Sequence, residues 1–350
     1  MFSSLFHDHG SLEPVSLDIV GAIRMSHLHE LFPELKDSLP SIRLGEVPTP
    51  LRCLKGLSPG PADVWLKDES VFGDGGWGGN KVRKLEWLIP EAKRRGRTTL
   101  LTVGGLGTNW GLACALYGRE HGLKTVLALI DQPVDEHVEA QLERLEASGA
   151  EIHFTHSKAR TIATVPWLMV RHRPYFLPAG GSSAIGTLGA VEIALELAAQ
   201  VERGEIQEPS HVVTAVGSGG TAAGLLLGFR LAGLKTKVVG VVVNDTLRLD
   251  SRALTGLAKK TERLLRKRGA VLPDHGVDVE KLMVVDSQLG PGYGHPTESA
   301  DRARSLASEA EGLELDPVYT AKAMAGLLEL NDGRLGDGPV VFIDTNGPRD

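Results

Sequence analysis

The sequence predicts a two-lobed α/β fold with parallel-rich sheets flanked by helices, and three observations lead to this prediction. The chain of 350 residues exceeds the size at which a single hydrophobic core usually stops growing. Short apolar runs alternate with longer amphipathic stretches, and strands that alternate with helices form parallel sheets. The composition is that of a packed globular protein, with 42% hydrophobic and 23% charged residues.

Strands are expected where short apolar runs are rich in β-branched residues. These runs cover residues 98–103, 124–130, 211–216, 236–243 and 339–344. Three longer stretches repeat apolar residues at helical spacing and end in glycine, which is typical of helices. They begin at residues 109, 136 and 188.

A further helix is expected to begin near Asn80, a residue type that can cap a helix. Apolar residues follow at helical spacing from Val82 onward, and Pro90 should end or kink the helix because proline has no backbone N–H. Two polar stretches complete the pattern. We interpret "SKARTIA" after residue 157 as a loop and the basic stretch from residue 258 as a solvated helix, since runs of charge usually face water.

Charge and cysteine content exclude several classes of function. The chain has 38 basic and 44 acidic residues and no long basic stripe, so no nucleic-acid partner is expected. Cys53 and Cys114 are spaced as neither a zinc site nor a redox pair, which suits a reducing compartment, and we expect both to be buried. The first residues do not resemble a signal peptide, and no apolar window approaches 18 residues. We expect a cytoplasmic protein without a membrane partner.

Lys81 stands at the start of the predicted helix, directly after a run that contains five glycines between residues 73 and 79. The positive end of the helix dipole disfavours an ammonium group and favours the neutral, nucleophilic amine that a Schiff base requires. The glycines would let a planar ligand approach the backbone. Taken alone, a lysine at a helix start is far more often a solvated side chain, so this feature needs support from elsewhere.

A second glycine run, "GSGGT" at residues 217–221, lies between an apolar strand and a helix of small residues. Several backbone N–H groups and the helix dipole can meet there on one anion, which predicts a phosphate site, although a tight turn would also use glycine. The run lacks the Walker ending and does not match the dinucleotide spacing, which disfavours an NAD-dependent oxidoreductase. Similar turns at residues 102–112 and 178–190 indicate one cofactor held from several sides.

The ordered strings "GGNKVRKLE", "GGLGTN", "PAGGS", "GSGGT", "PGYGHPT" and "DPVYTAKAMAGL" resemble the fold-type II pyridoxal-phosphate (PLP) enzymes, in the branch of D-cysteine desulfhydrase and 1-aminocyclopropane-1-carboxylate (ACC) deaminase. The resemblance runs from about residue 32 to residue 344. It implies the cofactor pyridoxal 5'-phosphate, a small amino-acid substrate and a homodimer. It also implies an N-terminal extension at 1–30, a large domain at 31–83 and 179–350, and a small domain at 84–178.

The resemblance assigns roles to individual residues. Lys81 would bind the cofactor covalently and later move the α-proton, Asn109 would hydrogen-bond the phenolic oxygen of the ring, and Thr108 would face the substrate. The implied cofactor-binding set is Lys81, Asn80, Lys84, Asn109, Gly217, Ser218, Gly219, Gly220, Thr221 and Thr320. The implied catalytic set is Lys81, Tyr293, Tyr319 and Thr108, and the implied substrate-binding set is Thr108, Asn109, Trp110 and Tyr293. Both tyrosines could instead be core residues.

Thr320 bears on the choice of reaction. In the resemblance it meets the pyridine nitrogen, where ACC deaminases carry a glutamate and the desulfhydrases a threonine. A neutral hydroxyl cannot enforce protonation of that nitrogen as a carboxylate can, so the electron sink is weaker and loss of a β-leaving group is favoured over ring opening. We therefore expect an α,β-elimination lyase that releases a keto acid, ammonia and a leaving group such as sulfide.

Two departures from the branch affect the pocket. Trp110 follows Asn109 where the branch has histidine or glutamine, and two alternatives stay open for it: packing in the core and contact with the substrate. Asp344 and Asn346 replace a more common histidine and glycine near the C-terminus. The alternatives that stay open are a β-replacement synthase, an amino-acid racemase with a tyrosine as second acid or base, an ACC deaminase-like deaminase, and a PLP-binding protein without catalysis.

Overall fold

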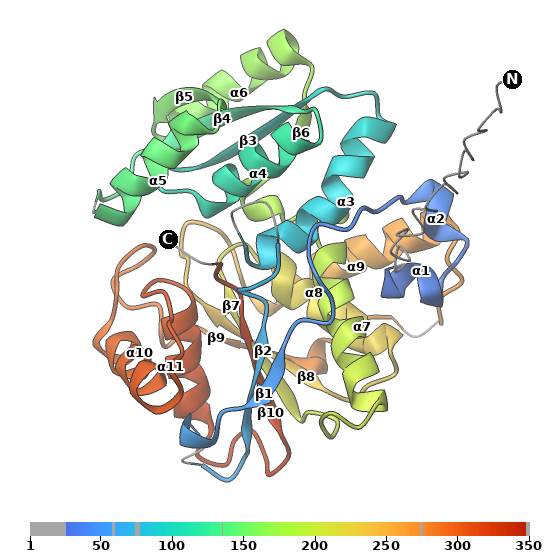
Figure 1. Cartoon of the computed structure of the whole chain (residues 1–350), viewed down its shortest axis with the longest axis vertical. Coiled ribbons are helices and arrows are strands. Elements are labelled where there is room, and N and C mark those ends of the chain that lie inside the picture. Colours follow the sequence, from blue (N-terminus) through green and yellow to red (C-terminus); the bar gives the residue numbers. More distant parts are fainter. Residues whose placement is uncertain (1–25, 58–59, 74–77, 135, 274–275, 348–350) are drawn as a thin grey trace, which may run out of the picture.

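The computed structural model describes residues 26–57, 60–73, 78–134, 136–273 and 276–347. Two sheets lie one above the other in Figure 1, each accompanied by helices. The mixed α/β fold with parallel-rich sheets is therefore confirmed. All five predicted strands are present, as β3, β4, β7, β8 and β10, and the three helices predicted to begin at residues 109, 136 and 188 are α4, α5 and α7.

The larger sheet has six strands in the order β1-β2-β10-β7-β8-β9. Only the β1–β2 pair is antiparallel, and β7 and β10 are buried along their whole length, as expected for the centre of a parallel sheet. Its strands are β1 (Leu51–Cys53), β2 (Val64–Asp68), β7 (His211–Val216), β8 (Lys237–Val242), β9 (Leu282–Val285) and β10 (Val340–Asp344).

The smaller sheet has four strands in the order β5-β4-β3-β6, and all of its pairs are parallel. Its strands are β3 (Thr99–Gly105), β4 (Lys124–Ile130), β5 (Glu151–His156) and β6 (Tyr175–Leu177). Its helices are α4 (Asn109–Glu120), α5 (Glu136–Ala147) and α6 (Lys158–His172). The first helix packs on β3 and β4, and the last packs on β3, β4 and β5.

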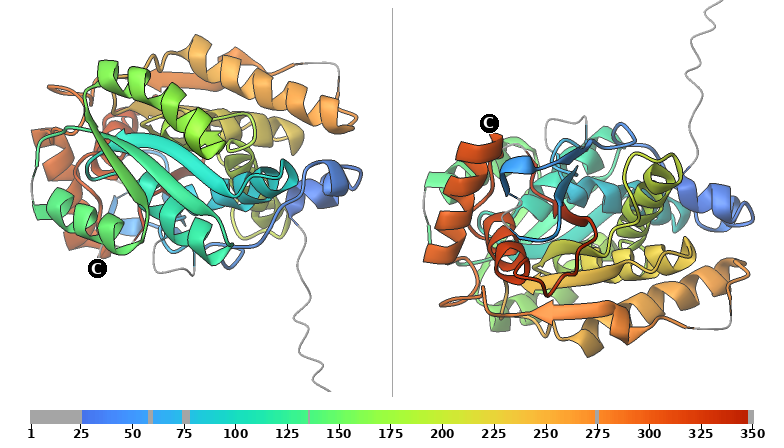
Figure 2. Two further views of the ribbon diagram at one scale, coloured as in Figure 1. Left: turned by 90° about the horizontal axis from the view of Figure 1, so that it is seen from above. Right: turned by 90° about the horizontal axis from the view of Figure 1, so that it is seen from below.

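Helices cover both faces of the larger sheet, and each face has its own hydrophobic cluster. Figure 2 shows α10 and α11 on one side and α7 and α8 on the other. The helices are α7 (Leu188–Glu202), α8 (Gly220–Leu231), α9 (Ser251–Arg268), α10 (Glu298–Glu311) and α11 (Thr320–Leu330). Short elements are α1 (His27–Leu31), α2 (Leu35–Ser38), η1 (Lys55–Leu57), η2 (Ala179–Gly181) and η3 (Val279–Lys281).

Helix α3 (Asn80–Arg94) connects the two sheets, because it packs on α7 beside the larger sheet and on α4 beside the smaller one. It begins at Asn80 as predicted, and it runs past Pro90 to Arg94, so Pro90 does not end it. Proline leaves the carbonyl of Glu86, four residues earlier, without its helical donor. The backbone N–H of Ile42 donates to that carbonyl at 3.0 Å, so the helix continues for one more turn.

A buried network of charges holds α3 in place. The guanidinium of Arg83 donates to Glu69 and to Glu196, each at 2.9 Å, and it stacks on the ring of Phe72. Lys67 also donates to Glu196. Since each carboxylate of this network has a cationic partner, the desolvation cost of burying it is offset, and the position of α3 is fixed relative to β2 and α7.

Two further expectations needed correction. The stretch "SKARTIA" is not a loop, because it forms the start of α6, where the hydroxyl of Ser157 accepts from the backbone N–H of Arg160. Cys53 is only half-buried in β1, whereas Cys114 is buried as expected. Cys53 lies in the strand at the edge of the larger sheet, and a three-residue edge strand is not covered on all sides.

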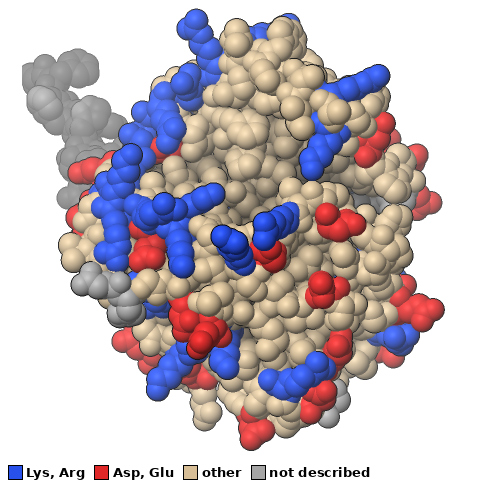
Figure 3. Space-filling view, turned by 180° about the vertical axis from the view of Figure 1, so that it is seen from behind, with Lys and Arg blue, Asp and Glu red and all other residues tan. Residues whose placement is uncertain are grey.

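The basic stretch from residue 258 lies in and after α9, as predicted, and part of its charge is paired. Arg266 contacts Glu262, and Arg268 contacts Glu91 at 3.0 Å. On the face shown in Figure 3, Lys and Arg gather toward one side, and Asp and Glu are interspersed among them. No helix in the described part of the chain is both long enough and apolar enough to cross a membrane.

The predicted N-terminal extension lies mostly outside the described residues. Its last residues enter α1, which packs on α7, and the carboxylate of Glu192 accepts from the backbone N–H groups of His27 and Leu28. Helix α3 runs without a break through the predicted limit between residues 83 and 84. The domain limits stay a prediction.

Candidate active site

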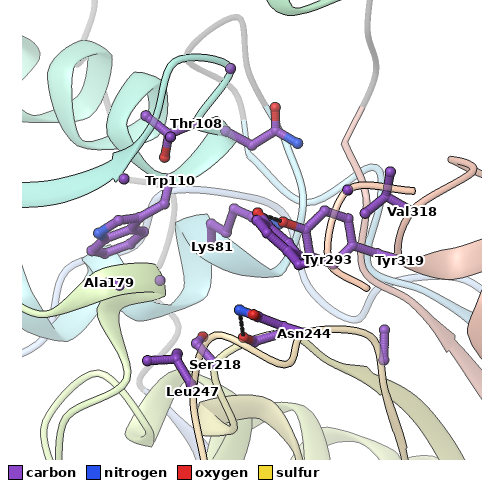
Figure 4. Close-up of a pocket in the computed structure, with 18 of the residues that line it drawn as sticks. Lys81, Thr108, Trp110, Ala179, Ser218, Asn244, Leu247, Tyr293, Val318 and Tyr319 are labelled. Atoms are coloured by element: carbon purple, nitrogen blue, oxygen red, sulfur yellow. Dashed lines mark hydrogen bonds between the residues drawn. The ribbon is translucent and has the colours of Figure 1, made fainter. Parts of the chain in front are cut away.

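A cavity of about 280 Å³ lies where the carboxyl ends of β3 and β7 and the first turn of α3 meet. Ligand sites of open α/β sheets occur at these strand ends. Figure 4 shows Lys81 between Thr108 and Trp110 on one side and Tyr293 and Tyr319 on the other. The predicted site residues that line the cavity are Asn80, Lys81, Lys84, Thr108, Asn109, Trp110, Gly217, Ser218, Gly219, Thr221, Tyr293 and Tyr319.

Lys81 is the second residue of α3 and lines the cavity, with its Nζ 5.9 Å from the centroid of the Tyr319 ring. The neighbouring Asn80 donates from Nδ2 to Thr221 Oγ1 at 2.9 Å. This hydrogen bond joins the first turn of α3 to the first turn of α8. The lysine and the glycine-rich turn are thereby held next to each other.

Lys84 is buried one turn further along α3, and its Nζ donates to the carbonyl of Gly180 at 2.7 Å. Burial and the neighbouring charge of Lys81 lower the pKa of this amine to about 7. No carboxylate of the described residues forms an ion pair with it. Its Nζ lies 3.4 Å from the point that a Cβ on Gly220 would occupy, so the amine lies beside the turn that begins α8.

The turn before α8 offers backbone donors to the same place. Gly219, at the N-cap of α8, has a φ of 88° and provides no side-chain cap. Helix N-termini of this kind bind anions. The backbone N–H of Gly220 already donates to Ser182 Oγ, and this serine is also hydrogen-bonded to Ser218 at 2.9 Å. A buried amine without a counter-charge beside a helix N-terminus fits the phosphate of PLP.

Asn109 and Thr108 begin α4 at the opposite side of the cavity. The hydroxyl of Thr108 caps the helix and accepts from the backbone N–H of Gly111 at 3.1 Å. Asn109 Oδ1 accepts from Gln141 Nε2 at 2.6 Å. Since its oxygen is engaged, the amide N–H groups of Asn109 remain for a ligand oxygen.

Of the two alternatives for Trp110, packing in the core is confirmed, and contact with the substrate stays a prediction. It is only 3% exposed and belongs to the hydrophobic core, and it also lines the cavity. Its Nε1 donates to Thr102 Oγ1 at 2.9 Å. The indole ring packs directly on Gly181. A Cβ at this position would lie 2.6 Å from the indole, so a side chain larger than that of glycine would clash with Trp110.

The two tyrosines lie together at the cavity. Their hydroxyl groups are hydrogen-bonded to each other, and their rings are in edge contact with centroids 6.0 Å apart. Burial raises the pKa of Tyr293 and outweighs the hydrogen bond with Tyr319, which acts in the other direction. Both tyrosines line the cavity, and Tyr319 also packs against the hydrophobic core of the larger sheet.

Two predicted site residues do not line the cavity. Gly220 lies just behind it, with its N–H bound to Ser182. Thr320 is fully buried at the start of α11, and its hydroxyl donates to Asp316 Oδ2 at 2.7 Å and accepts from the backbone N–H of Asp316 at 2.8 Å. The contact of Thr320 with a pyridine nitrogen stays a prediction.

Asp344 is buried at the end of β10, close to the cavity residue Thr345. Burial raises its pKa to about 8, and the neighbouring carboxylates of Asp68 and Asp316 act in the same direction, while the charge of Lys81 and the backbone N–H of Asn346 oppose them. A carboxyl group therefore stands near Lys81 that is largely protonated at neutral pH.

Sequence reasoning missed four polar residues of the site, Gln132, Gln141, Asn244 and Thr345. Gln132 and Asn244 line the cavity just after β4 and β8, at the strand ends where ligand residues are expected. That rule would have found both of them. Gln141 lies on α5 and reaches Asn109 from 32 positions away in the sequence, and no sequence pattern indicated this contact.

Comparison with known proteins gives one consistent family. The model of the family "Pyridoxal-phosphate dependent enzyme" matches residues 42–346. A protein of Salmonella paratyphi A named D-cysteine desulfhydrase is 34% identical over 322 residues, covering 88% of this chain and 94% of its own. A protein of Salmonella schwarzengrund with the same name is 35% identical over the same shares. The solved structure of an ACC deaminase homologue has a TM-score of 0.77 at 30% identity and covers 90% of this chain and 94% of its own.

Proposed function

The chain belongs to the family of pyridoxal-phosphate dependent enzymes, and from this premise we propose that it is a lyase that acts on a small amino acid by α,β-elimination. The proposed substrate carries a β-leaving group, as D-cysteine does, because the Salmonella relatives are named D-cysteine desulfhydrase. For D-cysteine, substrate and water would give pyruvate, ammonia and hydrogen sulfide.

One observation carries the proposal. The buried amine of Lys84, which pairs with no carboxylate of the described residues, lies beside the turn of α8 in the same cavity as Lys81. Lys81 would hold PLP covalently, and Lys84 with residues 217–221 would hold its phosphate. Bound there, PLP supplies an electron sink that stabilises negative charge at the α-carbon of an amino acid.

The side chains around the cavity provide the proton transfers. Nζ of Lys81, in its neutral form, would accept the proton from the substrate α-carbon. The phenol of Tyr293 is protonated at neutral pH and would donate a proton to the leaving thiolate, with Tyr319 as its hydrogen-bond partner. Asn109 would orient the cofactor ring and Thr108 the substrate. Trp110 would bound the substrate end of the cavity.

Elimination is favoured over ring opening because Thr320, and not a carboxylate, occupies the position implied to face the pyridine nitrogen. Racemisation remains a second candidate, supported by the tyrosine pair, since a second acid or base on the other side of the substrate from Lys81 is what inversion requires.

The purified holoenzyme should be incubated separately with D-cysteine, L-cysteine, D-serine and ACC, and keto acid, sulfide and optical inversion should be measured. Release of keto acid and sulfide from a cysteine enantiomer is the expected result. Inversion without keto acid would establish the racemase, and a spectrum unchanged by all four amino acids would indicate a non-catalytic binding protein.

We also propose that the chain acts in the cytoplasm as a homodimer, as the family resemblance implies. The reducing compartment suits the two free cysteines. Sedimentation of the holoenzyme at micromolar concentration would distinguish a dimer from a monomer.

A further inference from the structure

A cluster of two histidines and a glutamate lies on the smaller sheet, at the end opposite to the cavity. Glu151 is the first residue of β5, and His153 follows two positions later on the same face of this edge strand. His172 is the last residue of α6, which packs on β5. The cavity lies at the carboxyl ends of the parallel strands, whereas this cluster lies at the amino end of β5, in the upper part of Figure 1.

The three side chains converge on one point. His153 Nε2 lies 2.8 Å from Glu151 Oε1, and His172 Nε2 lies 3.3 Å from the same oxygen. All three ligand atoms are within 4.8 Å of one another. Ligands of a tetrahedral zinc ion, with bonds of about 2.0–2.1 Å, are roughly 3.3 Å apart, so a single ion could contact all three with small side-chain movements.

His172 provides an independent observation. Its Nε2 is shielded from solvent and forms no hydrogen bond within the described part of the chain, although Glu151 Oε1 is 3.3 Å away. A polar nitrogen that is shielded from solvent and makes no hydrogen bond is costly and calls for an explanation. A nitrogen and an oxygen that bind the same metal ion point at the ion and not at each other, so they sit at this separation without a hydrogen bond between them.

The chemistry of the ligands selects the type of ion. Two imidazoles and one carboxylate suit zinc and its neighbours in the first transition row, while magnesium and calcium prefer sets of oxygen atoms.

We propose that Glu151, His153 and His172 form a binding site for a divalent transition-metal ion such as Zn²⁺. The ion would join the first residue of an edge strand to the last residue of the helix that covers it. The side chains are 44%, 25% and 16% exposed, so water would complete the coordination. Because the site lies at the far end of the sheet from the cavity, its effect is to stabilise the small sheet and not to take part in the reaction.

Trp167 provides a built-in reporter, since its ring is in edge contact with His153 with centroids 5.9 Å apart. The holoenzyme, freed of metal by a chelator, should be titrated with Co²⁺ while tryptophan fluorescence is recorded, and with Zn²⁺ by calorimetry. Saturable quenching and a Zn²⁺ site of one ion per chain are expected. Trp167→Phe should remove most of the quenching and leave the calorimetric site unchanged.

His172→Ala and the milder His172→Gln should each weaken Zn²⁺ binding roughly tenfold or more. His156→Ala is the matched control, because His156 lies on the same strand and pairs with an exposed carboxylate, Asp131, without a third ligand. Zn²⁺ should raise the melting temperature of the parent and of His156→Ala, but not of the His172 variants. Equal Zn²⁺ affinity and stoichiometry in the parent and in folded His172→Gln would overturn the proposal.

Discussion

Gln141 Nε2 donates a hydrogen bond of 2.6 Å to Asn109 Oδ1, and both side chains are buried. The bond fixes which end of the Asn109 amide is the acceptor, so the amide hydrogens are free to donate into the cavity. Gln141 thus acts on the proposed cofactor site through Asn109, without lining the cavity itself.

Replacing Gln141 by methionine removes this hydrogen bond at similar volume. Asn109 Oδ1 then loses its partner and the amide can rotate, which should weaken PLP binding roughly five- to tenfold, the value of one neutral hydrogen bond. Equilibrium dialysis with PLP, followed by absorbance, measures the effect. Glu143→Gln, an exposed change on the same helix, is the control, and an unchanged PLP affinity in Gln141→Met would contradict the role given to Gln141.

Lys84→Met should weaken PLP binding without lowering the stability of the folded chain. In the parent without PLP, the pKa of Lys84 is lowered from 10.5 to about 7, so the unfolded chain binds more protons between these values and stability rises with pH there. The methionine variant should lose this contribution and be at least as stable as the parent at pH 7. Its PLP affinity should fall roughly ten- to hundredfold, as for loss of a charged hydrogen bond.

Denaturant melts at pH 7 and pH 9.5, together with PLP titration, test the Lys84 prediction. Lys93→Met is the matched control, because Lys93 is exposed on the same helix. A Lys84→Met protein that binds PLP as tightly as the parent would exclude Lys84 from the phosphate site.

Asp344→Asn should change how stability depends on pH. The pKa of Asp344 is raised from 3.8 to about 8, so the folded chain binds the extra proton and the parent loses stability as pH rises between these values. The stability of the asparagine variant should not fall in this way. Its advantage in stability over the parent should therefore be largest above pH 8. Thermal melts at pH 5 and pH 8.5 check it, with the exposed Asp337→Asn as control; a similar gain at both pH values would be inconsistent with the raised pKa.

Trp110→Ala should destabilise the protein by about 3–5 kcal/mol, because removing a buried indole leaves a void. Trp110→Phe leaves a smaller void and loses the hydrogen bond to Thr102, so it should destabilise the protein by about 1–2 kcal/mol. Urea unfolding measures both. If the phenylalanine variant is as stable as predicted but accepts larger substrates, Trp110 also limits the substrate end of the cavity.

Much of the fold was predictable because the local spacing of apolar residues in the sequence indicates which segments are buried. The apolar runs at β7 and β10 are fully buried central strands, and α3 begins at Asn80 as predicted. Asn80 does not cap the helix, because Gly79 is at the N-cap and the Asn80 side chain donates to Thr221. The expected end at Pro90 failed because the partner that compensates for it, Ile42, comes from a distant segment. The start of α6 was missed because the cap at Ser157 stood in a stretch interpreted as a polar loop.

The site was predictable to the extent that glycine turns and Lys81 are local features. The polar partner that orients Asn109 is not local, because Gln141 reaches it from 32 positions away through tertiary packing. The raised pKa of Asp344 likewise depends on burial and on carboxylates that the sheet brings together. These contacts could be seen only in the folded chain.

The central claim is that the amine of Lys81 binds PLP covalently. Borohydride reduction of the purified holoenzyme, followed by peptide mapping, tests it most directly. The account predicts that the reduced pyridoxyl group is found on the peptide that contains Lys81. A label on Lys84 or on any other lysine, or no label on a protein saturated with PLP, would contradict it.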